Sequence, residues 1–260
     1  MIQVVEITQE FGQGKKQKTA LKRVSWTVLN GSVTGLIGRK GSGKTAAIRI
    51  ITGIQEPSHG KVLLDGNDIA QDPMEARRAF GYVPDTTDQF LGLTGEEYLS
   101  FIADIYEVEE DDRRHCLSTY AKELKVDLEL KHRMSGYSKG VYKKVMLLGA
   151  MIYQPRNLIL DEFFDGLSAS EVDSVKQVLK EYAQGGRAVL VADKKLQTVD
   201  RLCDQVVVLV EGESKYTGSL TGLFDKYGDA ASLDMIDLMI NKDTDKWFSS
   251  DETQGSDSAD

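Results

Sequence analysis

Cysteine, long apolar runs and a leader segment are scarce or missing in this sequence. The two cysteines, Cys116 and Cys203, are far apart and lack the spacing of a metal site, which is typical of reduced thiols in a cytosolic protein. No apolar run approaches the roughly 20 residues that are needed to cross a bilayer. The first residues, Met1–Ile7, lack the basic region and apolar stretch of a secretory signal. We therefore expect a chain that is not secreted and does not span a membrane by itself.

An excess of positive charge is also missing. The formal net charge is −9, which argues against nucleic acid as the main partner because phosphate backbones are bound by basic surfaces. Residues 241–260 hold six acidic residues and two lysines, and residues 249–260 have no apolar side chain larger than alanine. We expect 241–260 to be an acidic, disordered tail, with a docking segment as the alternative. The 260 residues are long enough for a full α/β core, either as one domain or as one core with a smaller inserted lobe.

One octet has the pattern Gly-x-x-x-x-Gly-Lys-[Ser/Thr]. It follows the apolar run 33–37, which is typical of a buried strand, and precedes the run 46–51, which has helical spacing. Glycines let backbone N–H groups approach an anion, so this pattern predicts a loop that binds the phosphates of a nucleoside triphosphate. The alternative is a glycine-rich turn, which the flanking strand and helix make less favourable. The predicted nucleotide-binding residues are Gly38, Arg39, Lys40, Gly41, Ser42, Gly43, Lys44, Thr45 and Ala46.

A second motif supplies carboxylates. The apolar run Leu158–Leu160 ends in Asp161 and Glu162. In a phosphate-loop protein, Asp161 is expected to hold Mg²⁺ together with Thr45, and Glu162 to act as general base on the attacking water. An acidic surface turn is the alternative.

The rest of the chain shows two kinds of periodicity. β-like runs at 2–7, 24–29 and 60–66 predict an antiparallel patch, and helical spacing from about 95 to 151 predicts an inserted helical lobe. The pattern then alternates between strands at 158–160, 188–191 and 206–210 and a helix at 169–182, which predicts parallel, fully buried strands.

The run Tyr137–Val141 resembles the Leu-Ser-Gly-Gly-Gln signature of ATP-binding cassette (ABC) transporter nucleotide-binding domains. The likeness covers nearly the whole chain up to the acidic tail. It also includes Phe11 and the runs Phe80–Asp85, Asp165–Ser168 and Gly186–Lys194. The resemblance implies an α/β fold with a P-loop NTPase (RecA-like) core, an antiparallel β edge subdomain and a helical subdomain inserted at about 86–150, all within a domain spanning 1–240.

The resemblance also implies partners and roles. Two such domains would close head to tail over ATP and Mg²⁺, with Ser138, Lys139 and Gly140 of one subunit completing the site of the other. Phe11 would stack on adenine, although a core phenylalanine is the alternative. Separate membrane-spanning subunits would hold the chain at the cytoplasmic face of the membrane. Their docking is expected on the lobe from Asp85 to Leu130, where the apolar side chains of Phe90, Leu91 and Leu93 form either contacts to the partner or packing within the lobe.

Several positions depart from the pattern of the family. Asp85 replaces a glutamine, and it is expected to serve Mg²⁺ through water. Lys194 replaces the histidine that steadies the γ-phosphate, and it supplies positive charge without proton exchange near pH 7. A register slip of one residue would put Asp193 there instead. Ser168 replaces an aspartate of the loop that crosses the dimer, and Phe163 with Phe164 replaces a proline-threonine pair, which we interpret as packing.

Two functions follow from these residues. The first is an ATPase subunit that powers export through separate membrane chains, with Glu162, Lys194 and Asp85 in catalysis. The second is a weakly hydrolysing or regulatory clamp that closes on ATP and pairs with a more active cassette, which the changes at Asp85, Ser168 and Lys194 favour.

Overall fold

A computed structural model describes residues 1–12, 14, 17–85 and 88–227. The predicted acidic tail at 241–260 lies outside the described residues.

The centre of the molecule is a six-stranded sheet. Its strand order is β10-β9-β3-β8-β7-β6, and all neighbours are parallel except the antiparallel pair β9 and β10. The strands are β3 (Val33–Ile37), β6 (Phe80–Val83), β7 (Asn157–Asp161), β8 (Ala188–Asp193), β9 (Gln205–Val210) and β10 (Glu213–Ser219). Every residue of β3, β7 and β8 is buried, which confirms the predicted parallel, fully buried strands.

A second, four-stranded antiparallel sheet has the order β2-β1-β4-β5 and confirms the predicted antiparallel edge. The strands are β1 (Ile2–Phe11), β2 (Lys18–Val28), β4 (His59–Leu64) and β5 (Asn67–Asp68). Both β1 and β2 are longer than the predicted runs 2–7 and 24–29. Their outer halves hold only isolated apolar residues, such as Leu21, and no apolar run, yet they pair with each other, as between Glu10 and Thr19.

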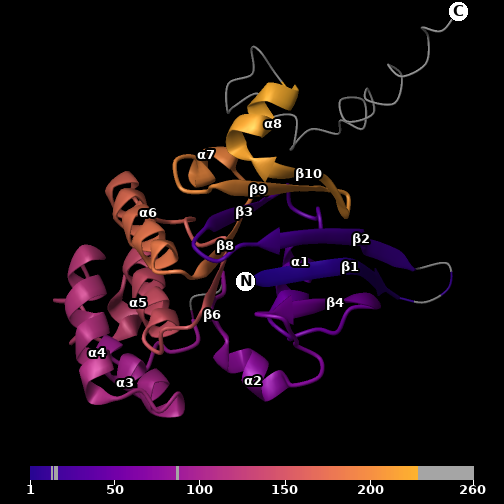
Figure 1. The fold of residues 1–260 in the computed structure, drawn as a ribbon. Coiled ribbons are helices and arrows are strands. Elements are labelled where there is room, and N and C mark those ends of the chain that lie inside the picture. The colour runs from indigo at the N-terminus through magenta and orange to yellow at the C-terminus, as the bar shows by residue number, and fades with distance from the viewer. Residues whose placement is uncertain (13, 15–16, 86–87, 228–260) are drawn as a thin grey trace, which may run out of the picture.

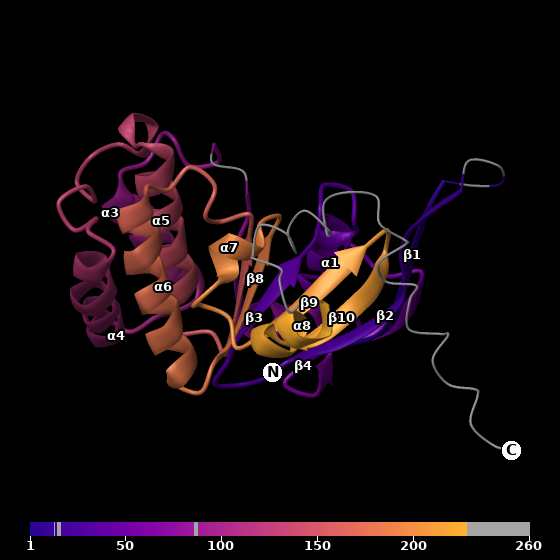
Figure 2. The ribbon, with the colours of Figure 1, turned by 90° about the horizontal axis from the view of Figure 1, so that it is seen from above.

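Helices cover both faces of the central sheet (Figures 1 and 2). Helix α1 and the antiparallel sheet share one core with residues such as Leu36 and Leu190, while α3, α5 and α6 pack on the opposite face. The helices are α1 (Lys44–Ile51), α2 (Pro73–Arg78), α3 (Gly95–Ile105), α4 (Glu110–Cys116), α5 (Lys139–Met151), α6 (Ala169–Gln184), α7 (Leu196–Val199) and α8 (Leu220–Tyr227), with a π-helical turn at Leu117–Ala121 and a 3₁₀ turn at Met134–Gly136. In the chain, α3 to α5 lie between β6 and β7, as expected for an inserted helical subdomain.

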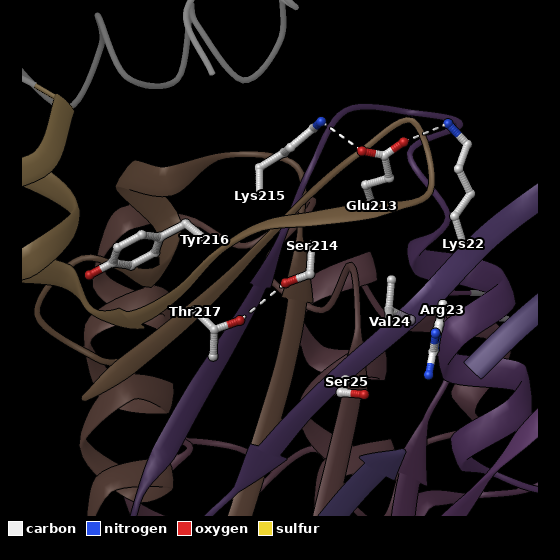
Figure 3. A pocket seen from close by; sticks show the side chains of 9 residues that line it. All are labelled: Lys22, Arg23, Val24, Ser25, Glu213, Ser214, Lys215, Tyr216 and Thr217. Atoms are coloured by element: carbon white, nitrogen blue, oxygen red, sulfur yellow. Dashed lines mark hydrogen bonds and ion pairs between the residues drawn. The ribbon is translucent and has the colours of Figure 1, made fainter. Parts of the chain in front are cut away.

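The edge strands of the two sheets meet at Glu213 (Figure 3). Its carboxylate accepts a hydrogen bond from Lys215 at 2.7 Å and from Lys22 of β2 at 2.8 Å. These two bonds lower the pKa of Glu213 to about 2. Neither β10 nor α8 was predicted from the sequence. Strand β10 has no apolar run, since Tyr216 is its one large apolar residue.

We expect the core between the sheets to dominate stability. Leu190 lies on a central strand and is 0% exposed, whereas Leu128 lies in a turn and is 79% exposed. Leu190→Ala should lower the free energy of unfolding by about 2–5 kcal/mol, because it removes buried methyl groups and leaves a cavity. The matched change Leu128→Ala should alter it by less than about 0.5 kcal/mol. Urea denaturation of both variants measures the difference, and equal losses would contradict the assignment of this core.

Candidate nucleotide-binding and hydrolysis site

The predicted site residues come from the carboxyl ends of four parallel strands. The phosphate loop follows β3, Asp85 follows β6 by two residues, Glu162 follows β7 and Lys194 follows β8. Neighbouring parallel strands end at the same edge of a sheet, and β3, β8, β7 and β6 are neighbours in that order. The fold therefore brings these four segments together.

The phosphate loop depends on its glycines. Gly41 and Gly43 have φ angles of +86° and +110°, which side-chain-bearing residues rarely adopt. A Cβ atom on Gly43 would lie 2.7 Å from the main-chain oxygen of Ala20 and 2.7 Å from Leu21 Cδ2. The Ser42 hydroxyl is buried and has no hydrogen-bond partner within the described part of the chain. The loop thus combines a tight turn with a buried hydroxyl, that of Ser42, which could accept or donate a hydrogen bond to a ligand.

Lys44 lies across this loop. Its ammonium donates to the main-chain oxygen of Gly38 at 2.5 Å and to that of Arg39 at 3.3 Å. Burial lowers the pKa of Lys44, and the nearby carboxylates of Glu162 and Asp161 act in the opposite direction. The lysine therefore lies between the loop and the predicted acidic pair.

The other loop residues differ in their surroundings. The guanidinium of Arg39 forms an ion pair with Glu211 at 3.0 Å. Lys40 and Thr45 are exposed, and Ala46 is half-buried against the core beneath the loop. Exposure of Thr45 in the first turn of α1 leaves its hydroxyl accessible, as a metal ligand requires.

The two adjacent carboxylates have different environments. Burial is the main reason why the pKa of Asp161 rises to about 6, and the negative charges of Glu162 and Asp85 add to it. Glu162 has a positive φ of +41°, and its main-chain N–H donates to the oxygen of Ala192 at 2.9 Å. Its carboxylate lies 3.6 Å from the ammonium of Lys194. One carboxyl group is thus buried near the loop, and the other is partly exposed beside a cation.

Asp193 and Lys194 are distinguished by their partners. Asp193 is 5% exposed, and its carboxylate accepts the main-chain N–H of Lys195 at 2.9 Å. The side chain of Lys194 is 43% exposed and approaches Glu162. Lys194 is therefore the member of the pair that forms an ion pair with Glu162.

The signature run begins helix α5. Ser138 is the N-cap and accepts the N–H of Val141 at 3.2 Å, so the helix begins at Lys139. Lys139 forms an ion pair with Asp165 at 2.9 Å. Gly140 packs closely, since a Cβ there would lie 2.9 Å from Glu171 Oε1.

The signature and the phosphate loop belong to opposite faces of the sheet. Helix α5 packs on one face, and α1 packs on the other. Among the described residues, no hydrogen bond or ion pair joins Ser138, Lys139 or Gly140 to the loop 38–45. The structure does not bring the signature and the loop together within one chain.

Four aromatic and loop residues complete the sequence predictions. Phe11 is 45% exposed at the end of β1, which contradicts the alternative of a core phenylalanine. Phe163 and Phe164 are buried and lie edge to face with ring centres 5.6 Å apart, which confirms their interpretation as packing. Ser168 is the N-cap of α6.

One residue that contacts the predicted catalytic segments was not predicted from the sequence. Lys143 of α5 is fully buried and donates to the main-chain oxygen of Glu162 at 2.6 Å. Its only signal is that Lys143 and Lys144 interrupt an otherwise apolar helical run, and that pattern does not say what the lysine contacts.

The donor set suits Mg²⁺. Thr45, Asp161 and Asp85 offer oxygen atoms, which this ion prefers, and it usually takes only one or two carboxylates together with substrate phosphates. Burial is the main reason for the raised pKa of Asp161, and the negative charges of Glu162 and Asp85, which a divalent cation would neutralise, add to it. Residues 1–12, 14, 17–85 and 88–227 contain no cluster of three or more His, Cys, Asp or Glu side chains that could hold a metal.

The fold and this site define a phosphate-loop ATPase. A family model described as "ABC transporter" matches residues 21–165. Over 231 residues the chain is 33% identical to the ABC-type transporter ATP-binding protein EcsA of Bacillus subtilis (strain 168), covering 88% of this chain and 94% of EcsA. A solved structure of the ATP binding subunit of an ABC transporter is 30% identical with a TM-score of 0.83, covering 93% of this chain and all of that one. CbiO1 from Clostridium perfringens, which is part of the ABC transporter complex cbiONQ, is 26% identical with a TM-score of 0.75, covering 86% and 90% of the two chains.

The chain belongs to the ABC transporter family as an ATP-binding subunit. It is an ATPase, and its cofactors are ATP and Mg²⁺. None of the helices in the described part of the chain is long and apolar enough to span a bilayer.

The geometry of Gly43 gives a direct test of the loop. Gly43→Ala should weaken ATP binding by at least about tenfold, because the new methyl group strains a left-handed φ and meets main-chain atoms. Gly186 provides the matched control, since it also has a left-handed φ, of +83°, but has open space around it and lies at the other end of β8. Gly186→Ala should lower stability by about 1–2 kcal/mol and leave ATP affinity unchanged. Titration with a fluorescent ATP analogue measures both, and similar affinities in the two variants would contradict a binding role for the loop.

Proposed function

We propose that this chain hydrolyses ATP as one of a pair of cassettes and powers export through separate membrane-spanning subunits. The observation that carries the proposal is Glu162, a carboxylate that follows a buried strand, lies next to Asp161 and approaches Lys194 at 3.6 Å. A chain that only closes on ATP does not need a general base.

The roles of the residues follow from their chemistry. Backbone N–H groups of the loop and the ammonium of Lys44 would hold the β- and γ-phosphates. Thr45, Asp161 and Asp85 would hold Mg²⁺, which neutralises charge that develops on the phosphates. Glu162 would accept a proton from the attacking water, and Lys194 would supply positive charge to the γ-phosphate. The exposed ring of Phe11 would stack on adenine.

A second cassette would complete each site. Ser138 and Lys139 are exposed at the beginning of α5, where helix N–H groups favour an anion. Since no described contact joins them to the loop of their own chain, a γ-phosphate bound on a partner is a suitable ligand. ATP supplies that phosphate and hydrolysis removes it, so the pair would close on ATP and open after turnover.

The membrane subunits would dock between the core and the helical lobe. A cleft there is lined by residues of α2, β6, α3 and α5 and of the segments that follow α1, α3 and α5, including Ile54, Tyr82, Ile102 and Tyr106. Exposed Ile105 lies on the same helix as Ile102. Membership of cbiO1 in a complex with other subunits supports such an assembly. This docking would place the chain at the cytoplasmic face of the membrane.

The earlier docking candidates divide into two groups. Phe90 packs on Tyr98, with ring centres 4.8 Å apart, and Leu93 packs against the core, so both serve the lobe itself. Leu91 is 40% exposed and remains a candidate contact. Export, rather than import, rests on the Tyr-Ser-Lys-Gly signature and the Tyr-Val-Pro-Asp run, which resemble those of exporter subunits.

The test is Mg-ATP hydrolysis by the purified chain over a series of protein concentrations. Turnover per chain should rise with concentration, because each site needs a partner. Glu162→Gln should lower turnover by on the order of 10²–10⁴-fold while an ATP-bound dimer accumulates, since the proton acceptor is lost but binding is kept. Lys44→Ala should abolish both turnover and dimerisation.

Exposed residues of the same types provide controls. Glu110→Gln on α4 and Lys61→Ala on β4 should leave turnover unchanged. Unchanged turnover in Glu162→Gln would overturn the assignment of the base. Binding of ATP without any turnover in the parent chain, even with membrane subunits added, would favour the regulatory clamp instead.

A further inference from the structure

Lys143 is a buried cation between two predicted catalytic segments. Its side chain is 0% exposed. The ammonium donates to the main-chain oxygen of Glu162 at 2.6 Å and lies 3.5 Å from Asp85 Oδ1. Burial lowers the pKa of Lys143, and the charge of Asp85 opposes this effect. A buried ammonium is costly unless it is paired, so these two oxygens are what make the position tolerable.

The contact with Glu162 acts on a strained peptide. A φ of +41° is rare for a residue with a side chain and persists only where the surroundings hold it. Here the N–H of Glu162 is held by the oxygen of Ala192 on β8, and its carbonyl is held by Lys143 on α5. Both main-chain groups are therefore fixed from different elements, and they set the direction in which the Glu162 carboxylate leaves the chain.

The contact with Asp85 reaches a different segment. Asp85 follows β6 where the chain leaves the core for the helical lobe, and its side chain is 50% exposed. Among the described residues, the ion pair with Lys143 is the only one that Asp85 forms. Lys143 thus connects the position of this segment to the peptide of Glu162 through one side chain.

We propose that Lys143 is a positioning residue that couples Asp85 to the orientation of Glu162. The lysine touches neither nucleotide nor water in this role. It keeps the glutamate in its strained conformation, and displacement of Asp85 would loosen that hold. The inference rests on the proposed function of Glu162 as general base.

The test compares Lys143→Met with Lys176→Met. Lys176 of α6 is a matched control, because its ammonium also donates to a main-chain oxygen, that of Asp200, at 2.7 Å, away from the site. We expect Lys143→Met to lower kcat by at least about tenfold with the KM for ATP changed by less than about threefold, since the phosphate loop is untouched and the base is misplaced. Lys176→Met should keep kcat within about twofold of the parent chain. Equal kcat in the two variants would overturn the proposal, and so would a loss in Lys143→Met that appears only in KM.

A double-mutant cycle tests the coupling to Asp85. If one contact links the two residues, Asp85→Asn and Lys143→Met should be non-additive, with the double variant losing less activity than the product of the single losses. Fully multiplicative losses would overturn the coupling. Thermal unfolding of each variant checks folding, and Lys143→Gln, which keeps a donor without the charge, replaces Lys143→Met if that variant does not fold.

The parent chain and Glu162→Gln separate this proposal from the one that it rests on. Full turnover in Glu162→Gln would remove the general base and with it the reason for Lys143 to position it. Loss of turnover in Glu162→Gln, together with normal kcat in Lys143→Met, would leave the base in place and overturn the role of Lys143 alone.

Discussion

The site depends on the parallel alignment of β3, β8, β7 and β6. Parallel strands end at one edge, and here each end carries a polar segment directly after a buried apolar run. The buried apolar residues of the strands pack on both faces of the sheet and fix the positions of the strands. The polar residues at the strand ends therefore do not have to hold the sheet together. The phosphate loop, the acidic pair and the cation after β8 are far apart in the sequence. They come close to one another because the strands that precede them are aligned.

Burial at this edge gives the charges their properties. Carboxylates and ammonium groups that leave water lose hydration, so each requires an opposite charge or a hydrogen-bond partner. The pKa of Asp161 rises and that of Lys44 falls for this reason, and the two groups partly compensate each other. An anionic triphosphate and a divalent cation would enter a region whose cations and carboxylates are already close together. The electrostatic balance of the site and its ability to bind Mg-ATP therefore have the same origin.

Helix α5 of the helical lobe contacts this edge of the sheet directly. The helix begins at the exposed signature, and its Lys143 donates a hydrogen bond to the main-chain oxygen of Glu162. One helix thus carries both the surface that would meet a partner and the side chain that holds the base. A shift of α5 would move both. Contact with a partner at the signature could in this way change the position of Glu162.

Much of the fold and of the candidate site could be predicted from the sequence alone. Four features are formed by residues that are close together in the sequence: the phosphate loop, the acidic pair, the buried strands and the signature. Such local patterns can be recognised without knowledge of the fold. The sequence could not predict β10, which has no apolar run, or the outer halves of β1 and β2, which pair through backbone groups. Only the tertiary structure decided that Lys194 forms an ion pair with Glu162, that Phe11 is exposed, and that Lys143 contacts both Asp85 and Glu162. These facts depend on contacts between residues that are far apart in the chain, and no spacing in the sequence records them.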